Sequence, residues 1–340
     1  MRTVDEVGSS SEEGVFVVIV NYRTAALVVQ CLLSLAGTIP ALRGGKVVVA
    51  DNASGDDSLP VLHDAIDRHG CRPWVEVISL PRNGGFAYGN NRAIEWVRRH
   101  DPLFQAVVLL NPDTIVRPGA IGTLVSFFAT HADAGIVGAA IEDKHGTLQR
   151  TAHLFPSPIG ELEAAAQLAL LSRALGTYSA SRLVDAEPSP CDWVSGACLA
   201  VRREVFDAIG PLDEGYFLYF EETDFCLRAK LAGWGCWLVP QARVVHLEGA
   251  ATGIRDPRRR RPAYWFDSRR RFFAKRYGVT GLALADLLWL SGRASLRLRQ
   301  ILGLGGARKT EPEPERFALD MVMGDAKAVL RGELRKLRVQ

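Results

Sequence analysis

Short runs of β-branched and other apolar residues alternate with segments of helical periodicity over the first half of the chain. Continuous apolar runs such as VFVVIV are typical of strands that are buried on both faces. The runs that predict strands lie at residues 15–20, 46–51, 74–80, 106–111 and 135–143. Helical patterns separate or follow them at residues 27–37, 59–66, 89–100 and 119–131. This alternation predicts an α/β fold with a Rossmann-like, mostly parallel sheet and helices on both of its faces.

The second half of the chain is less regular. Residues 158–176 predict a helix or a long excursion, and residues 193–210 predict a strand that runs into a helix. Residues 221–234 begin with acidic residues and end with Lys230, the charge order that a helix dipole favours. Residues 235–246 predict a last strand, which ends at a histidine.

The chain changes character after about residue 280. Residues 282–303 mix leucine and tryptophan with regularly placed arginine, and residues 316–337 carry apolar residues at helical spacing. Residues 310–315 (TEPEPE) predict a linker between these segments. No stretch reaches the roughly 18–20 apolar residues that a membrane span needs. We therefore expect a soluble or peripheral protein without a signal peptide.

These patterns suggest how the chain is organised into domains. We expect a flexible N-terminus over residues 1–14 and one large domain over residues 15–278. Residues 15–115 would form one half of this domain and residues 116–278 the other. Residues 279–340 would form an amphipathic helical C-terminal extension.

The distribution of charge says more than the net charge of +3. Residues 253–276 hold ten Lys and Arg against two Asp, so the rest of the chain sums to −5. A basic block on a mildly acidic body indicates an anionic partner at one place. The six cysteines show no zinc-site spacing, which favours reduced thiols in a cytoplasmic protein.

Polar side chains follow three of the predicted strands at the point where each strand ends. These side chains are Asn21 and Tyr22, Asp51 and Asn52, and Asn111 and Asp113. In parallel sheets, ligands bind in the crevice beyond the carboxyl ends of the strands. Each residue alone could also be a turn or helix-cap residue. The three pairs in order favour a shared binding crevice.

A glycine-rich segment, NGGFAYGNNRAI at residues 83–94, opens one predicted helix. Its Asn83 and Gly85 lie at the turn, and Asn90 lies where the helix begins. Glycine there would let the backbone approach a ligand closely, although a loop that only turns the chain is also possible. The segment lacks the Gly-x-x-x-x-Gly-Lys-Ser/Thr pattern, which excludes a phosphate loop of that type.

Acidic residues supply the candidate chemistry. A single carboxylate at Asp113 leaves coordination sites for phosphate and water, which suits Mg²⁺ or Mn²⁺. Glu221, Glu222 and Asp224 lie beside aromatic residues, where clustered carboxylates raise one another's pKa and one can accept a proton. An acidic helix N-terminus is the alternative. His246 is a candidate metal ligand or substrate contact.

Six motifs in order resemble the family 2 glycosyltransferases of the GT-A type, and they span roughly residues 15–275. The motifs are VNYRTA, ADNASGDDS, NGGFAYGNNRAI, LLNPDT, VSGACLAVRREVFDAIGPLDEGYFLYFEETDFCLRAKLAGW and VVHLEGAATG. The Asn-Pro-Asp form and the closing DSRRRFFAKRYG are most similar to the rhamnosyltransferase-like branch, which builds polysaccharides and cell-wall linkers on lipid carriers.

The resemblance implies roles for the two halves of the domain and for the candidate residues. Residues 15–115 would be the nucleotide-binding half and residues 116–278 the acceptor half. Asp113 would reach the cation within Asn-Pro-Asp, and His246 would touch the diphosphate or the metal. Glu222 would be the general base, with Glu221 and Asp224 as its neighbours. The residues expected at the nucleotide are Asn21, Tyr22, Asp51, Asn52, Asn83, Gly85, Asn90 and Asn111. The chain departs from the family pattern twice, with Asn111 in place of an Asp and with Glu-Glu where Glu-Asp is commoner.

We therefore expect an inverting transfer of L-rhamnose from dTDP-L-rhamnose to a lipid-linked or polysaccharide acceptor, in bacterial cell-surface glycan synthesis. A UDP-sugar is the alternative donor. We expect a cytoplasmic enzyme, peripheral on the inner face of the plasma membrane, that contacts the membrane through residues 255–303. The C-terminal extension could instead pack on a second subunit in a homodimer.

Three other classes of function were weighed. A sugar-phosphate nucleotidyltransferase should carry a glycine-rich loop after the first strand, where this chain has NYRTAALV. A nucleic-acid binder is disfavoured because acids around the crevice repel phosphate. A non-catalytic nucleotide-binding relative is disfavoured because Glu222 is present.

Overall fold

The computed structural model describes residues 14–42, 44–168, 181–182, 186–247, 258–304 and 313–334. The chain divides into two compact units. Unit 1 comprises residues 1–152, 183–217 and 221–253, and unit 2 comprises residues 153–182, 218–220 and 254–340.

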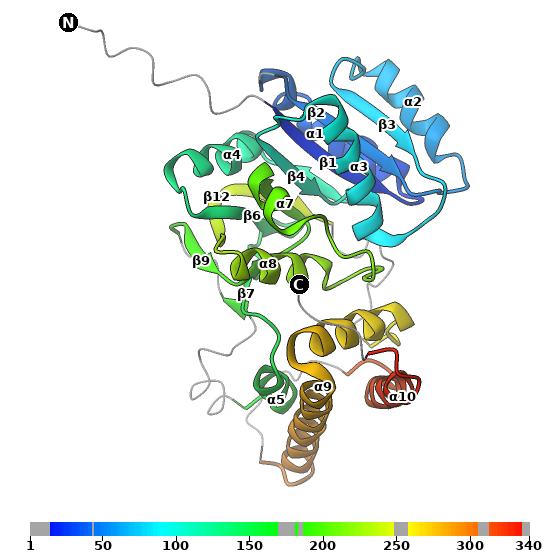
Figure 1. Ribbon diagram of the computed structural model, residues 1–340, viewed down its shortest axis with the longest axis vertical. Coiled ribbons are helices and arrows are strands. Elements are labelled where there is room, and N and C mark those ends of the chain that lie inside the picture. Colours follow the sequence, from blue (N-terminus) through cyan, green and yellow to red (C-terminus); the bar gives the residue numbers. More distant parts are fainter. Residues whose placement is uncertain are drawn as a thin grey trace, which may run out of the picture. The chain divides into compact units, whose positions relative to one another are not determined.

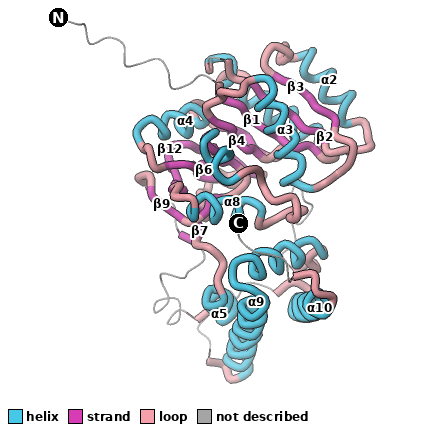
Figure 2. The backbone as a smooth tube through the Cα atoms, in the orientation of Figure 1, coloured by secondary structure: helices cyan, strands magenta, loops and turns pink. Residues whose placement is uncertain are grey.

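Unit 1 is built around a nine-stranded sheet (Figures 1 and 2). Its strands are β1 (Val15–Asn21), β2 (Lys46–Asp51), β3 (Val75–Ser79), β4 (Ala106–Leu110), β5 (Thr114–Val116), β6 (Ala134–Glu142), β9 (Ser189–Cys191), β11 (Cys198–Arg202) and β12 (Gly235–His246). The order is β3-β2-β1-β4-β11-β6-β12-β5, and β9 also pairs with β12. The strands from β3 to β4 are parallel, whereas β11 runs antiparallel to both β4 and β6.

Helices accompany the strands of this sheet in the order that the sequence predicts. They are α1 (Ala25–Leu35), the short 3-10 turn η1 (Ile39–Ala41), α2 (Ser58–Arg68), α3 (Gly85–His100), α4 (Ala120–Thr130), α7 (Arg203–Ile209) and α8 (Glu221–Leu231). Every residue of β1, β4 and β6 is buried, as expected for continuous apolar strands that are covered on both faces. The predicted α/β class with a mostly parallel sheet is confirmed. The remaining short strands are β7 (Ala152–His153), β8 (Ser181–Arg182) and β10 (Trp193–Val194).

Unit 2 contains the helices α5 (Pro158–Ala166), α9 (Ala263–Ile301) and α10 (Phe317–Leu330). Its small apolar core comprises Ala165, Phe266, Trp289, Phe317 and Met321. The two helical patterns predicted after residue 280 correspond to the second half of α9 and to α10. Residues 169–176 of the predicted helix over 158–176 lie outside the described residues.

Several boundaries expected from the sequence stay predictions. Most of the expected flexible N-terminus, residues 1–13, lies outside the described part of the chain. The boundary expected after residue 278 falls inside α9, at Gly278, whose φ of 72° and ψ of −179° are not helical. Within the described ranges, no helix is long and apolar enough to cross a membrane.

Candidate active site

Asn21 and Asp51 end two neighbouring parallel strands, and they stand side by side in the register of β1 and β2. Asn21 Nδ2 donates a hydrogen bond to Asp51 Oδ1 over 2.7 Å, and Ser54 Oγ donates to the same oxygen over 2.5 Å. All three side chains are buried. Tyr22 follows directly and is 40% exposed. The expected nucleotide residues at these strand ends therefore lie together, with a fixed carboxylate beside an exposed aromatic ring.

Asn52 joins the end of β2 to the glycine-rich segment. Its Nδ2 donates to Asn83 Oδ1 over 3.0 Å and to the Gly85 carbonyl oxygen over 2.9 Å. The Gly85 N–H donates to Asn83 Oδ1 over 3.0 Å. Asn90 lies within α3, donates to the Phe86 carbonyl oxygen and has a buried Oδ1 without a hydrogen-bond partner among the described residues.

The structure gives Gly85 a different neighbour from the one the sequence suggests. A Cβ at this residue would lie 2.0 Å from the Phe217 carbonyl oxygen, and its φ of 88° is left-handed. The Phe86 N–H donates to the same carbonyl oxygen over 2.8 Å. The space beside Gly85 is therefore filled by the backbone of the 211–217 segment, which requires glycine for a close approach within the protein.

Asn111, Asp113 and His246 form the third cluster. His246 Nε2 lies 3.2 Å from Asp113 Oδ1 and 3.4 Å from Asn111 Nδ2. Asp113 is buried, while the side chain of His246 is 18% exposed. One carboxylate oxygen and one imidazole nitrogen thus face the same point, next to an amide.

A strand that the sequence pattern missed creates this cluster. β5 has only three residues and pairs antiparallel with the end of β12, so that Thr114 stands opposite His246. The Leu247 N–H donates to the Asp113 carbonyl oxygen over 2.9 Å. Three residues directly after a turn are too few for a periodicity signal, whereas the pairing fixes the turn beside His246.

Asp113 Oδ1 and His246 Nε2 could share a divalent cation, whereas the amide nitrogen of Asn111 can only donate hydrogen bonds. Two cis ligands of an octahedral ion at about 2.1–2.2 Å lie about 3 Å apart, close to the separation of Asp113 Oδ1 and His246 Nε2. In the described part of the chain, no three His, Cys, Asp or Glu side chains gather as a metal cluster. The residues therefore fit an ion that takes few ligands from the protein and the rest from a bound diphosphate and water.

Glu221 and Glu222 open helix α8 and are the acidic centre of the site. Two residues with left-handed backbone, Tyr219 (φ 71°) and Phe220 (φ 68°), directly precede them. Consecutive left-handed residues other than glycine cost energy and are typical of functional sites. Both carboxyl groups have a buried Oε2 without a hydrogen-bond partner among the described residues.

Burial controls the protonation of this pair. It raises the pKa of Glu222 to about 7, although the backbone N–H groups of Glu222, Thr223 and Gly196 favour the charged form. Burial and the nearby charge of Glu222 raise the pKa of Glu221 well above its ordinary value. Glu221 is buried and Glu222 is partly exposed. Near neutral pH, the carboxyl group of Glu222 is thus able to gain or lose a proton.

Residues 196 and 197 link the acidic pair to the Asn-Pro-Asp cluster. The Asn111 N–H donates to the Ala197 carbonyl oxygen over 3.0 Å. A Cβ at Gly196 would lie 3.7 Å from Cδ of Glu222. The candidate base and the candidate metal cluster therefore flank one short segment of chain.

Asp224 occupies a different environment from the two glutamates. Its carboxylate accepts hydrogen bonds from Arg228 Nε over 2.9 Å and from the Tyr216 hydroxyl over 3.2 Å. Arg228 also donates to the carbonyl oxygens of Ile209 and Pro211. Asp224 and Arg228 therefore hold α8 against the 211–217 segment.

Four residues that the sequence analysis left out support the site. Ser54 fixes Asp51, and the left-handed Arg23 donates to Ser54 from both its backbone N–H and its Nε. Asn91 binds the backbone of Leu212 through both ends of its amide. Gly196 leaves room beside Glu222. Ser54 and Asn91 lie close in sequence to Asn52 and Asn90, which were predicted as nucleotide-binding residues. The sequence pattern does not indicate which of these neighbouring polar residues makes a structural hydrogen bond.

The chain is similar to several known proteins. The profile of a family described as glycosyltransferase-like family 2 matches residues 13–265. The N-acetylglucosaminyl-diphospho-decaprenol L-rhamnosyltransferase of Mycobacterium tuberculosis is 33% identical over 302 residues, which cover 84% of this chain and 91% of the relative. Rhamnosyltransferase WbbL of Escherichia coli K12 is 26% identical over 165 residues, 48% of this chain and 60% of that protein.

A solved structure extends the likeness to the fold. The mannosyltransferase PcManGT from Pyrobaculum calidifontis, in complex with GDP-Man and Mn²⁺, superposes with a TM-score of 0.51 at 15% identity. The likeness covers 93% of this chain and 80% of that one. The mixed sheet with polar strand ends thus defines a glycosyltransferase with a GT-A type fold. The chain itself belongs to glycosyltransferase family 2, as the sequence motifs indicate.

Proposed function

We propose that this glycosyltransferase moves L-rhamnose from dTDP-L-rhamnose to a sugar carried on a polyprenyl diphosphate, with inversion at the anomeric carbon. The Mycobacterium tuberculosis relative, which is named for an N-acetylglucosaminyl-diphospho-decaprenol acceptor, supports this choice. The observation that carries the proposal is the carboxyl group of the partly exposed residue Glu222, whose Oε2 has no hydrogen-bond partner among the described residues and which one short segment links to the Asp113 cluster.

Glu222 acts as the general base in this proposal. An inverting transfer needs a group that removes the proton of the acceptor hydroxyl as its oxygen attacks the anomeric carbon. The pKa of about 7 makes the carboxylate of Glu222 available at neutral pH and basic enough to accept that proton. The proton then resides on Glu222, and the nucleoside diphosphate leaves from the opposite face of the sugar.

Glu221 sets the electrostatic surroundings of the base. Burial and the charge of Glu222 raise the pKa of Glu221 well above its ordinary value, which favours its protonated form. A protonated Glu221 avoids placing a second negative charge beside the base and the diphosphate. Asp224 contributes by holding α8 through Arg228, so the two glutamates stay in place.

Asp113 and His246 would bind a divalent cation, Mg²⁺ or Mn²⁺, with Asn111 beside them. When bound, such an ion neutralises the charge that develops on the leaving diphosphate. His246 Nε2 must then be unprotonated so that its lone pair faces the ion. Asn111 stands where the family pattern has an Asp, so this group of three side chains has one negative charge fewer. Asp113 is then the only anion among Asn111, Asp113 and His246.

The strand ends would bind the nucleoside. Asp51 is fixed by Asn21 and Ser54, and its Oδ2 can also accept a hydrogen bond from a base or ribose. The exposed ring of Tyr22 offers a stacking surface. Asn52, Asn83 and Gly85 shape the adjoining backbone, and the buried Oδ1 of Asn90 is an available acceptor.

A UDP-sugar is the alternative donor, because none of these contacts distinguishes thymine from uracil. A panel of dTDP- and UDP-sugars with an N-acetylglucosaminyl diphosphate on a short lipid chain separates the two. We expect transfer from dTDP-L-rhamnose in the presence of Mn²⁺ or Mg²⁺. Transfer from UDP-sugars alone would show that the donor is a UDP-sugar and not dTDP-L-rhamnose. Absence of transfer from every nucleotide sugar would contradict the proposal.

The proposed acceptor also implies where the enzyme works. A polyprenyl chain keeps its sugar at the bilayer surface, so we propose that the enzyme binds the inner face of the plasma membrane peripherally. A homodimer is compatible with the same chemistry.

A further inference from the structure

Two arginines of the basic block, Arg269 and Arg270, are buried inside unit 2. Arg269 is buried, and its Nη1 lies 2.8 Å from Asp286 and its Nη2 3.0 Å from Glu161. Arg270 Nε lies 2.7 Å from Asp325. These guanidinium groups neutralise acids of unit 2, so they are not available to a lipid headgroup.

The aromatic residues of the block are also engaged within unit 2. Phe266, Phe272 and Phe273 are buried, and Trp265 packs edge-on against Phe220. These rings and the two buried arginines therefore leave the membrane contact expected of residues 255–303 to other side chains of that range.

The second half of α9 carries an unpartnered apolar face. Leu284, Leu287, Ala294, Leu298 and Ile301 are exposed at helical spacing, with Leu287 at 60% and Ile301 at 82%. The opposite face of the same segment is buried against α5 and α10, through residues such as Trp289, Gly292 and Leu296. The segment is thus apolar on both sides, which a helix that only covers a core does not require.

Helix α10 has the same property. Leu319, Val322, Met323, Val329 and Leu330 are exposed at helical spacing, while Met321 is buried in the unit 2 core. Helices α9 and α10 pack against each other, and each carries an exposed apolar stripe. Exposed apolar surface of this kind marks interaction sites.

The acidic side chains of these two helical segments are largely buried and do not lie on the exposed apolar stripes. The acids of these two segments are Asp286, Asp320 and Asp325, and none of their side chains is more than 15% exposed. Arg260 binds both carboxylate oxygens of Asp320, at 2.7 and 2.8 Å. Arg269 forms an ion pair with Asp286, and Arg270 forms one with Asp325. The outward faces of the two segments therefore present leucines without a carboxylate.

Arginines border the leucines instead. Arg297, 68% exposed, and Arg293 share a single carboxylate, that of Glu313, at 3.0 and 2.8 Å. Arg299 donates to the neutral carbonyl oxygen of Ala166. The rim of the patch therefore keeps an excess of positive charge.

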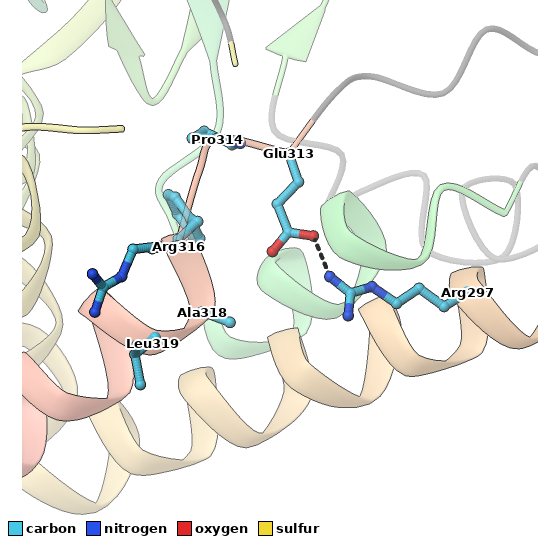
Figure 3. A pocket seen from close by; sticks show the side chains of 7 residues that line it. Arg297, Glu313, Pro314, Arg316, Ala318 and Leu319 are labelled. Carbon is cyan, nitrogen blue, oxygen red and sulfur yellow. Dashed lines mark hydrogen bonds and ion pairs between the residues drawn. The ribbon is translucent and has the colours of Figure 1, made fainter. Parts of the chain in front are cut away.

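One open pocket connects the two helices on this side. It has a volume of about 320 Å³ and is lined by Arg297 of α9, by Glu313 and Pro314, and by Arg316, Phe317, Ala318 and Leu319 at the start of α10. Figure 3 shows Arg297 paired with Glu313 across the pocket from Ala318 and Leu319. Leu319 of the α10 stripe and Arg297, next to Leu298 in the α9 stripe, therefore line the same opening.

We propose that α9 beyond Gly278 and α10 together dock unit 2 on the surface of an anionic bilayer. The exposed leucines enter the apolar boundary of the lipids, and Arg297, Arg299 and Arg316 contact the phosphates. The inference rests on the proposed function in that it names the surface through which the enzyme reaches a lipid-carried acceptor. A second copy of the chain fits less well, because a twofold contact between identical patches brings their arginine rims together.

Vesicle sedimentation of the full chain tests this docking surface. Vesicles of phosphatidylglycerol and phosphatidylcholine should bind the wild type, and Leu287→Glu/Leu298→Glu and Leu319→Glu/Met323→Glu should each bind about tenfold or more weakly. Leu103→Glu, at an 80% exposed leucine of unit 1, is the matched control and should bind like the wild type. Arg297→Ala/Arg299→Ala should weaken binding only when phosphatidylglycerol is present.

Unchanged vesicle binding by both leucine double variants would overturn the inference. A second result would also overturn it: the wild type does not bind vesicles, light scattering shows that it is a dimer, and the same variants are monomers. Circular dichroism and transfer to a water-soluble acceptor show whether the variants remain folded. Because sedimentation needs neither donor nor acceptor, a failed transfer assay would count against the proposed function and leave the docking result intact.

Discussion

The Asp113 carboxylate and the His246 imidazole lie 3.2 Å apart, although Asp113 directly precedes β5 and His246 ends β12, far along the sequence. The antiparallel pairing of β5 with β12 brings them together. A carboxylate and an imidazole at this separation can bind one cation between them, so the pairing of a three-residue strand creates the candidate metal site.

Removal of either ligand should weaken the response to metal. We expect Asp113→Asn and His246→Ala to raise the Mn²⁺ concentration for half-maximal transfer about tenfold or more, because each takes one donor from the ion. Metal titrations of activity and of Mn²⁺ binding in the presence of dTDP measure this. Asp57→Asn, at an exposed acid of the same unit, should leave both titrations unchanged, and an unchanged titration in the two ligand variants would reject the site.

The pH dependence should report Glu222. Because the base must be deprotonated, kcat/KM should fall about tenfold per pH unit below about pH 7, the pKa of Glu222. Glu222→Gln should lower turnover by about 10²–10⁴-fold and remove this acidic limb, while the affinity for dTDP stays nearly the same. Wild-type turnover in Glu222→Gln would exclude it as the base.

The same shifted pKa predicts an effect on stability. The folded protein holds the Glu222 proton more tightly than the unfolded chain, so this residue's contribution to stability falls as the pH rises from about 4.5 to about 7. Urea unfolding should therefore find Glu222→Gln more stable than the wild type at pH 8 and closer to it at pH 4.5. An identical difference at both pH values would contradict the raised pKa.

Gly85 should be intolerant of a side chain. Gly85→Ala forces a left-handed alanine and pushes a Cβ against the Phe217 carbonyl oxygen, so we expect a loss of about 2–4 kcal/mol in the free energy of unfolding. Gly122→Ala in α4 is the control, since its Cβ would meet no atom within 4 Å and should be neutral or mildly stabilising. Equal stability of the two variants would show that the close approach to Phe217 does not constrain this turn.

The arginine at the centre of unit 2 should matter for stability. Arg269→Met leaves Glu161, Asp286 and Asp325 without their shared buried cation, and we expect a cost of about 3–5 kcal/mol. Arg331→Met, which removes an exposed partner of Glu333, should change stability by less than about 1 kcal/mol. Thermal unfolding followed by circular dichroism compares them, and a small effect at Arg269 would mean that its carboxylates find other partners or protons.

The sequence predicts the parallel part of the sheet well because local information determines it. Each of β1, β2 and β4 is a continuous apolar run, and burial on both faces requires such runs. The polar residues at the strand ends follow from the same argument, since parallel strands bring their carboxyl ends to one edge. Asn21 and Asp51 accordingly lie in contact.

Long-range contacts set the limits of prediction. The pairing of β5 with β12 produces no local pattern in the sequence. The approach of the Phe217 carbonyl oxygen to Gly85 produces none either, so the sequence does not show why residue 85 must be glycine. The basic block shows the same limit. Its arginines resemble a solvated surface in the sequence, but acids from α9 and α10 neutralise Arg260, Arg269 and Arg270.

The most direct test of the account is a crystal structure with dTDP-L-rhamnose and Mn²⁺ bound to the Glu222→Gln variant, with the metal located by its anomalous scattering. We predict a manganese peak in contact with Asp113 and His246, the diphosphate on that ion, and the anomeric carbon facing residue 222. A manganese ion and nucleotide bound away from these residues would contradict the proposed active site.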